Sequence, residues 1–272
     1  MILKLVRKSW AFIKKDVRIL VSYRFSFFLE LFGIFFSILM FYFVARIFGQ
    51  AATPYLDAYG GDYFSFVLIG IAFSSYLGVA MGTFSGSIGQ GQVTGTLEAM
   101  LVTPTRLSTI LISSSLWSFA WASFRIVVYL VVGAALFGIN LSHANLSVAI
   151  LIQILSILTF SSLGILSAGF VLVFKQGNPM NMVLNAASSL LAGVYYPVTV
   201  LPVWLRPLSY LLPTTYSLRA MRLAVLQGYS LRDLAPDILI LALFSAVLLP
   251  LSLAAFRFAL RKAKMDGSLT QF

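Results

Sequence analysis

The chain alternates long apolar runs with short polar breaks, and this pattern predicts helices that cross a membrane. A helix needs about 20 apolar residues to cross the ~30 Å hydrocarbon core of a bilayer. The runs that we interpret as spans cover about residues 25–48, 63–84, 109–137, 146–174, 179–196 and 236–258. The predicted fold class is therefore an all-α integral membrane protein with six transmembrane helices.

One polar break, residues 86–108, carries helical spacing of its own. Leu97, Met100 and Leu101 recur at the i, i+3 and i+4 positions of one helix face, and Pro104 ends the run. The glycine-rich first half of this segment predicts a flexible approach out of the preceding span. The second half predicts a short helix that lies along the membrane interface and needs a partner to be stable.

Two further segments are predicted to lie at the membrane surface. Residues 1–24 mix lysine and arginine with apolar residues, which predicts an interfacial amphipathic helix, although a plain basic flank fits equally well. Residues 197–233 are apolar but interrupted by Pro202, Pro207 and Pro213, and they are too short to cross twice. We interpret them as a re-entrant or interfacial pair of short helices on the outer side.

Composition and charge agree with a membrane protein. Hydrophobic residues make up 60% of the chain and charged residues 10%, against about 25% charged residues in soluble domains. No polar segment is long enough to form a separate domain, so residues 1–272 are expected to form a single transmembrane domain. The net charge is +11, and the basic residues gather at the ends of the apolar runs. Anionic lipid headgroups are therefore the expected partners of these charges, and nucleic acid is not an expected partner.

The distribution of lysine and arginine also predicts the orientation. Both are more frequent in the segments on the side of the N-terminus than in the segments on the opposite side. Because positive charges favour the cytoplasmic side, both termini and residues 86–108 are predicted to be cytoplasmic.

The sequence carries little that points to catalysis. It contains no cysteine and a single histidine, His143, which excludes disulfides, thiolate metal sites and multi-histidine sites. The run GQGQVTG has no Gly-Lys-Ser/Thr and therefore is no phosphate-binding loop. We expect no catalytic, cofactor-binding or metal-binding residues in this chain, and any ATP hydrolysis must then occur in another protein.

Glu30 and Arg125 are charges inside predicted spans, where burial is costly and function is a common reason for it. Counted from the inner ends of their spans, the two residues differ in depth by roughly 16 Å, at ~1.5 Å per residue. The sequence thus predicts that they do not pair within one subunit unless the two helices are strongly offset or tilted. Both are candidates for a substrate path, together with the aromatic residues Tyr42, Tyr195 and Tyr196, for which an interfacial aromatic belt is the alternative.

Arg219 and Arg222 stand three residues apart and share one face of a predicted helix at the outer surface. They could bind lipid phosphate or a polyanionic substrate, but a plain surface role is the simpler interpretation.

Two stretches resemble a known family. GQVTGTLEAMLVTPTRLSTIL, residues 91–111, resembles the cytoplasmic coupling segment of ABC-2 type transporter permeases. GVYYPVTVLPVWLRPLSYLLPTTYSLRAMR, residues 193–222, is similar to the outer segment that these permeases carry before their last helix. With the spacing of the apolar runs, the resemblance covers essentially the whole chain.

This resemblance implies the permease subunit of an ATP-driven exporter in the plasma membrane of a prokaryote. The implied partners are a separate ATP-binding-cassette ATPase subunit, which would bind ATP and magnesium, and a second copy of the chain or a paralogous permease. The path would lie between the two permeases, lined mainly by the first, second and fifth spans, and would carry a lipid-like, drug-like or glycan substrate. The residues implied to couple the permease to the ATPase are Leu97, Glu98, Met100, Leu101, Thr103, Pro104 and Arg106.

Three alternatives stay open on the residues alone. Glu30 could act as the switch of an ion-coupled secondary transporter, which would need no ATPase. A membrane enzyme acting on lipids would need a polar catalytic cluster at one membrane face, and the sequence suggests none. Residues 86–108 could also form an ordinary interfacial helix whose Glu98 merely faces water.

Overall fold

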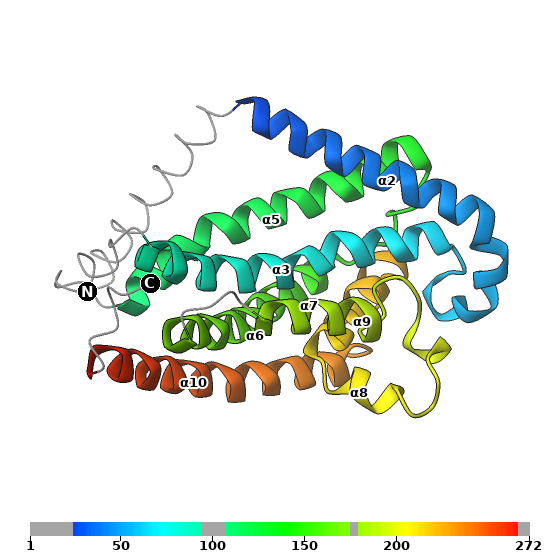
Figure 1. Ribbon diagram of the computed structural model, residues 1–272. Helices are drawn as coiled ribbons and strands as arrows, with labels where there is room; N and C mark the ends of the chain where they lie inside the picture. The colour runs from blue at the N-terminus through cyan, green and yellow to red at the C-terminus, as the bar shows by residue number, and fades with distance from the viewer. Residues whose placement is uncertain (1–23, 94–106, 175–178, 266–272) are drawn as a thin grey trace.

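The structure, a computed structural model, describes residues 24–93, 107–174 and 179–265 (Figure 1). In these ranges every regular element is a helix, which confirms the all-α fold class. The predicted N-terminal interfacial helix lies outside the described residues, apart from Arg24. The long helices are α2 (Arg24–Ala52), α3 (Tyr63–Val93), α5 (Leu107–Phe137), α6 (Leu146–Phe174) and α10 (Ala235–Met265). The shorter ones are α7 (Pro179–Leu191), α8 (Arg206–Tyr210) and α9 (Pro213–Leu226), with single 3-10 turns η1 (Thr53–Tyr55), η2 (Asp57–Tyr59) and η3 (Val198–Val200).

Five of these helices, α2, α3, α5, α6 and α10, are long and apolar enough to cross a membrane. They correspond to five of the predicted spans, and α6 has the bounds that its apolar run predicts. The predicted span 179–196 instead contains α7, a helix of 13 residues that is about 20 Å long. It ends early because the chain turns at Gly193, whose φ of +81° is a conformation that glycine adopts readily.

The second span continues further than predicted. α3 runs on through Gly86 and Gly89 to Val93, so the prediction of a flexible glycine-rich approach is wrong for residues 86–93. A Cβ atom at Gly89 would lie 3.8 Å from the side chain of Val171 on α6, whereas one at Gly86 would have no neighbouring atom within 4 Å. Gly89 therefore lies at the contact between α3 and α6, and small residues at such contacts let helices approach closely in lipid.

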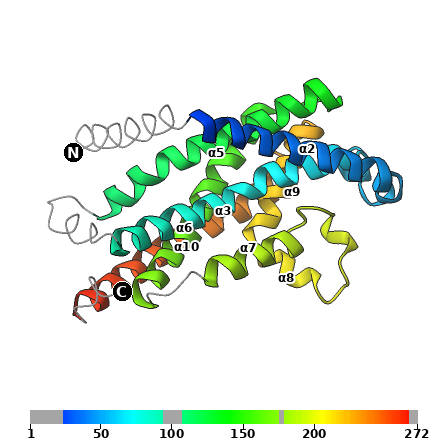
Figure 2. The same ribbon diagram turned by 45° about the horizontal axis from the view of Figure 1, so that its top comes forward.

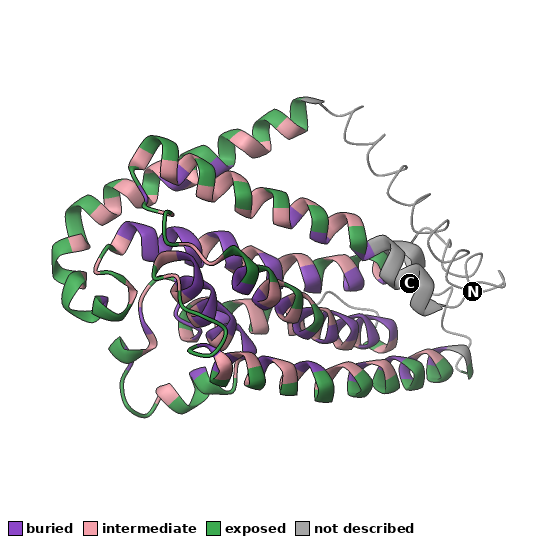
Figure 3. Cartoon of the chain, turned by 180° about the vertical axis from the view of Figure 1, so that it is seen from behind, coloured by how far each residue is buried: buried purple, intermediate pink, exposed green. Residues whose placement is uncertain are grey.

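The helices form a bundle with α3 at its centre (Figures 1 and 2). α2 and α5 cover one side of α3, and α6 covers the other side, with α10 beyond it. α2, α5 and α7 run in one direction along the bundle, and α3, α6 and α10 run in the opposite direction. Buried residues concentrate on α3, α6 and α9, whereas α2, α5 and α10 are largely exposed on their outer faces (Figure 3).

Contact between α3 and α6 depends on a glycine. A Cβ atom at Gly164 on α6 would collide with the carbonyl oxygen of Ala80 on α3. Short hydroxyl side chains add contacts across other helix pairs: Thr159 on α6 bonds Ser245 on α10 at 2.7 Å. The core therefore combines close backbone approach with small polar residues, as expected where lipid provides no hydrophobic drive for helix association.

The segment after α7 contains the two short helices that the prolines predict. Pro207 lies in the first turn of α8 and Pro213 opens α9, positions at which the missing N–H costs nothing. α8 lies at the periphery in both views, but α9 packs among α3, α6 and α10 (Figures 1 and 2). Most of α9 is buried, so this helix belongs to the core rather than to the surface.

Candidate transport site

The predicted coupling residues, from Leu97 to Arg106, lie outside the described residues. The helices that flank them are described. α3 ends and α5 begins at the end of the bundle where α10 also ends (Figure 1). α3 and α5 pack against each other, so the segment 94–106 joins neighbouring helices at this end, which we call the coupling end.

Glu30 and Arg125 form an ion pair, and the prediction that they are too far apart is wrong. Arg125 Nη1 lies 3.1 Å from Glu30 Oε1. The indole N–H of Trp121, one turn before Arg125 on α5, donates to both carboxylate oxygens at 3.1 Å. Glu30 therefore has two partners on α5, and the pair joins α2 to α5.

The error arose because α2 and α5 do not begin at the same level. Phe27 on α2 lies against Trp121, with ring centroids 5.7 Å apart, and Tyr42 lies against Phe137 at 4.7 Å. The described start of α2 is thus beside the middle of α5, and roughly the first ten residues of α5, about 15 Å of helix, extend beyond it. This offset cancels the depth difference that was counted from the span ends.

A cleft of about 360 Å³ lies beside this ion pair, between α3 and α5. Arg125 and the indole rings of Trp117 and Trp121 line it from α5. The two indoles are stacked with centroids 6.1 Å apart. The Nε atom of Arg125 is buried and has no hydrogen-bond partner among the described residues. The cleft thus offers an aromatic wall and a cationic group that keeps donor capacity, a combination suited to an amphiphilic molecule.

The tyrosines predicted to line a path lie elsewhere. Tyr42, twelve residues after Glu30 and so about 18 Å further along α2, packs between Phe64 and Phe137. Tyr195 stacks on Phe41 of α2 at 5.8 Å. The Tyr196 hydroxyl donates to the Leu190 carbonyl at 2.5 Å, which ties the turn after α7 to the helix itself. The structure therefore groups Glu30 with Arg125 but not with these three tyrosines, and their role in a path stays a prediction.

Arg222 is the main departure from prediction at the other end of the bundle. It was expected on the surface, but it is 2% exposed. Its guanidinium donates to three backbone carbonyls, those of Phe66 (3.0 Å), Gly193 (2.7 Å) and Val194 (2.8 Å), and lies 3.5 Å above the ring of Phe66. Burial lowers the pKa of Arg222 to about 9, so the group is still charged at neutral pH.

Arg219, one turn earlier on α9, is paired. Its guanidinium contacts the carboxylate of Asp237 in the first turn of α10, with Nε 3.0 and 3.1 Å from the two oxygens and Nη2 on one of them. Asp237 is 4% exposed. Arg219 and Arg222 therefore have different roles, one neutralised by an acid and the other held by carbonyl groups.

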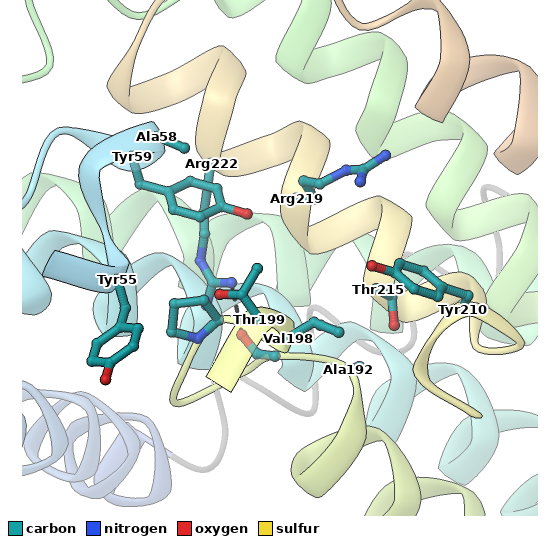
Figure 4. Close-up of a pocket in the computed structure, with 12 residues that line it drawn as sticks. Tyr55, Ala58, Tyr59, Ala192, Val198, Thr199, Tyr210, Thr215, Arg219 and Arg222 are labelled. Atoms are coloured by element: carbon teal, nitrogen blue, oxygen red, sulfur yellow. Dashed lines mark hydrogen bonds between the residues drawn. The ribbon is translucent and has the colours of Figure 1, made fainter. Parts of the chain in front are cut away.

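A cavity of about 200 Å³ lies between these two arginines and the turns at this end (Figure 4). Arg222 and Thr215 are buried on its floor, whereas Tyr55, Thr199 and Tyr210 are exposed at its rim. Among the described residues, no group of three or more His, Asp or Glu side chains lies close enough to hold a metal ion, here or elsewhere.

Sequence reasoning missed the roles of Trp121 and Asp237. Trp121 was not considered as a hydrogen-bond donor, although it stands one turn from Arg125 on the same helix face. Asp237 follows Pro236 at the start of an apolar run, where an acidic residue favours the helix N-terminus, and this signal gave no hint of a partner on α9.

The bundle of long apolar helices with small residues and ion pairs between them defines a multi-pass α-helical membrane protein. The model of the family described as ABC-2 type transporter matches residues 10–226. The chain belongs to this family, which confirms the resemblance of its two motifs. Its members are membrane components of transport systems and typically work with an ATPase subunit. The comparison with curated proteins found no match.

Proposed function

We propose that the chain is the permease subunit of an ATP-driven exporter, powered by a separate ATP-binding-cassette ATPase that binds ATP and magnesium. The observation that carries this proposal is the family match over residues 10–226, which includes the predicted coupling residues Leu97 to Arg106. In this proposal, the coupling helix docks on the ATPase and passes its closure to α3 and α5 as a rigid-body movement.

Six passes through the membrane are supported by the directions of the helices. α6 ends at the coupling end, and α10 begins at the opposite end (Figure 1). The chain must travel the length of the bundle once more between them. α7 covers about 20 Å of this distance, and the segment before α10 supplies the rest, which suits a re-entrant arrangement. With the N-terminus in the cytoplasm, six passes place the coupling segment and the C-terminus in the cytoplasm as well. The membrane in this proposal is the plasma membrane of a prokaryote.

A second permease, either another copy or a paralogue, is supported by the outer face of α2. Exposed apolar side chains recur along it every three or four residues: Phe25, Phe28, Phe32, Phe36, Met40, Phe43 and Ile47. Six passes are few to enclose a path, and this stripe gives a permease partner a continuous apolar surface beside lipid.

We further propose that the cleft beside Glu30 and Arg125 belongs to the export path. Trp117 and Trp121 would contact the apolar part of a lipid-like, drug-like or glycan-bearing amphiphile, and Arg125 would meet its polar part. The cleft lies between α3 and α5, and the ion pair beside it reaches Glu30 on α2, the helix that would face the second permease.

The test is purification of the chain from native membranes in mild detergent, with the ATPase activity of the co-purified material as the readout. We expect an ATP-binding-cassette subunit to accompany the wild type, and the substitution Glu98→Arg to remove it or to uncouple its activity. Asp57→Arg is the matched control, because it makes the same charge change at an exposed residue of η2, which follows the end of α2 that lies away from the coupling end (Figure 1). If no ATPase accompanies the wild type, or if both variants behave alike, the proposal is wrong.

The ion-coupled alternative gains no support from the site. Glu30 is already engaged by Arg125 and by the Trp121 indole, so its position has a structural explanation that requires no ion switch. The two mechanisms still differ in a direct test, since ion-coupled transport would stop when the ion gradient is abolished while ATP is present.

A further inference from the structure

The cavity at the end opposite the coupling segment holds a buried positive charge that the proposed function does not use. Its lining contains two arginines, and the charge of Arg219 is balanced by Asp237. None of the ion pairs between described residues involves Arg222, although this residue is almost fully buried. An isolated charge in a poorly solvated site is costly unless an opposite charge joins it.

We propose that this cavity binds a single phosphate group, with Arg222 as its counter-charge and the Tyr59 hydroxyl as a further donor. The inference is independent of the exporter proposal, because it concerns a ligand on this chain alone. The phosphate can come from the headgroup of a lipid or from free phosphate in solution, and the experiment below distinguishes these two sources.

The guanidinium has donors left for a ligand. Of its five N–H bonds, three are used by the carbonyls of Phe66, Gly193 and Val194. One N–H on each terminal nitrogen thus remains for a ligand. The three carbonyls need a hydrogen-bond donor, which explains the presence of the guanidinium. They are neutral dipoles, however, and do not balance the positive charge of Arg222. Among charged side chains, arginine is the one best suited to phosphate, because its planar donors match two phosphate oxygens.

Two phenol groups complete the cavity. In Figure 4 the hydroxyls of Tyr59 and Tyr210 point toward the space between them from opposite sides, while Arg219 turns away. Neither hydroxyl bonds to another group in the described part of the chain. Burial raises the pKa of Tyr59, although the nearby Arg222 opposes this, so the Tyr59 hydroxyl keeps its proton at neutral pH and can donate it in a hydrogen bond.

The size of the cavity limits the ligand. At about 200 Å³ it is smaller than the ~300–1,000 Å³ of sites that enclose a drug-sized molecule. It has room for one phosphate group and a few attached atoms. The rest of a larger ligand would extend past the exposed rim formed by Tyr55, Thr199 and Tyr210.

The experiment measures the unfolding temperature of the purified chain in an uncharged detergent, with no ATPase and no ATP. One series adds inorganic phosphate with the ionic strength held constant by chloride. The other adds a short-chain phosphatidic acid, with phosphatidylcholine of equal chain length as its reference. A ligand that binds the folded state raises the unfolding temperature in a saturable manner.

We expect at least one of the two probes to give a saturable increase. A response to inorganic phosphate identifies a soluble ligand, and a response to phosphatidic acid alone identifies a lipid headgroup. No saturable response to either probe would overturn the proposal, and it would leave the exporter proposal untouched.

Variants locate the site. Tyr59→Phe keeps the ring on Phe66 and removes one hydrogen bond to a charged ligand, so the affinity should fall at least tenfold. Tyr229→Phe, at an exposed tyrosine outside the cavity, is the matched control and should leave the affinity unchanged. Arg222→Gln should abolish the response, and if this variant does not fold, the comparison of the two tyrosine variants decides. Equal affinities for wild type and Tyr59→Phe would show that the probe binds elsewhere.

Discussion

The ion pair between Glu30 and Arg125 makes a quantitative prediction about what joins α2 to the bundle. α2 touches the rest of the structure through few buried side chains, and its contacts with α5 centre on this pair and on the rings around Tyr42. The perturbation is a double-mutant cycle with Glu30→Gln, Arg125→Gln and the double variant. Glutamine keeps the length of the glutamate side chain, removes its charge and replaces one of the two acceptor oxygens with an NH2 group.

The magnitude follows from burial. Removing one member of a fully buried ion pair costs about 3–5 kcal/mol, whereas a fully exposed pair contributes about 0–1 kcal/mol. The Arg125 and Glu30 side chains are 26% and 33% exposed, and their contact of 3.1 Å is reinforced by the Trp121 indole. We therefore expect a cost of about 2 kcal/mol for either single variant. The double variant should cost clearly less than the sum, with a coupling energy of about 1–2 kcal/mol.

Equilibrium unfolding in mixed micelles, followed by circular dichroism during titration with a denaturing detergent, measures these free energies. The control cycle combines Arg125→Gln with Asp57→Asn, because Asp57 is exposed and lies in η2 beyond the far end of α2. Distant sites should couple by less than about 0.5 kcal/mol. A coupling this small between Glu30 and Arg125 would refute the argument that their ion pair holds α2 against α5.

Two further predictions test packing. Gly164→Ala should lower the free energy of unfolding by about 1–3 kcal/mol, because the new methyl group on α6 would collide with the Ala80 carbonyl on α3. Gly82→Ala on α3 is the comparison, because its Cβ position has no neighbouring atom, and it should leave the free energy of unfolding unchanged or raise it by up to about 1 kcal/mol. Equal effects in the two thermal unfolding curves would contradict the close approach of α3 and α6. Ser209→Ala should leave the unfolding temperature unchanged or raise it, since the Ser209 hydroxyl is fully buried without a partner among the described residues, and a marked decrease would reveal a bond to a group that the structure does not describe.

Hydrophobic patterning was sufficient to predict the long helices. Their bounds depend on local signals such as the turn before Leu146 and the polar residues around Asp62, whose carboxylate accepts from the Ser65 backbone N–H at 2.9 Å and caps α3. The end of α3 was harder, because glycine is read as flexible wherever its neighbours in space are unknown. At Gly89 the neighbour is Val171, which is 82 residues away in the sequence.

The partners of the charged residues could not be predicted for the same reason. The level at which α2 begins relative to α5 is set by tertiary packing, so counting from span ends placed Glu30 and Arg125 at different depths. Similarly, spacing on one helix face grouped Arg219 with Arg222, although only packing decides that one meets Asp237 and the other enters the core. The coupling residues stay predictions, and the family match is their present support.

The short length of α7 explains why a charge is buried near the opposite end. A helix that stops at Leu191 leaves the carbonyls of Gly193 and Val194 without helical partners in a buried region, where such groups must find donors. α9 lies beside this turn, with the Thr214 hydroxyl 3.3 Å from the Ser188 hydroxyl on α7. Arg222 on α9 supplies the donors for the two carbonyls. A neutral side chain could have satisfied one carbonyl, but three carbonyls from two segments require a long side chain with several donors. The guanidinium that donates to these carbonyls also brings a positive charge, and this charge would give the proposed phosphate site its affinity for an anion.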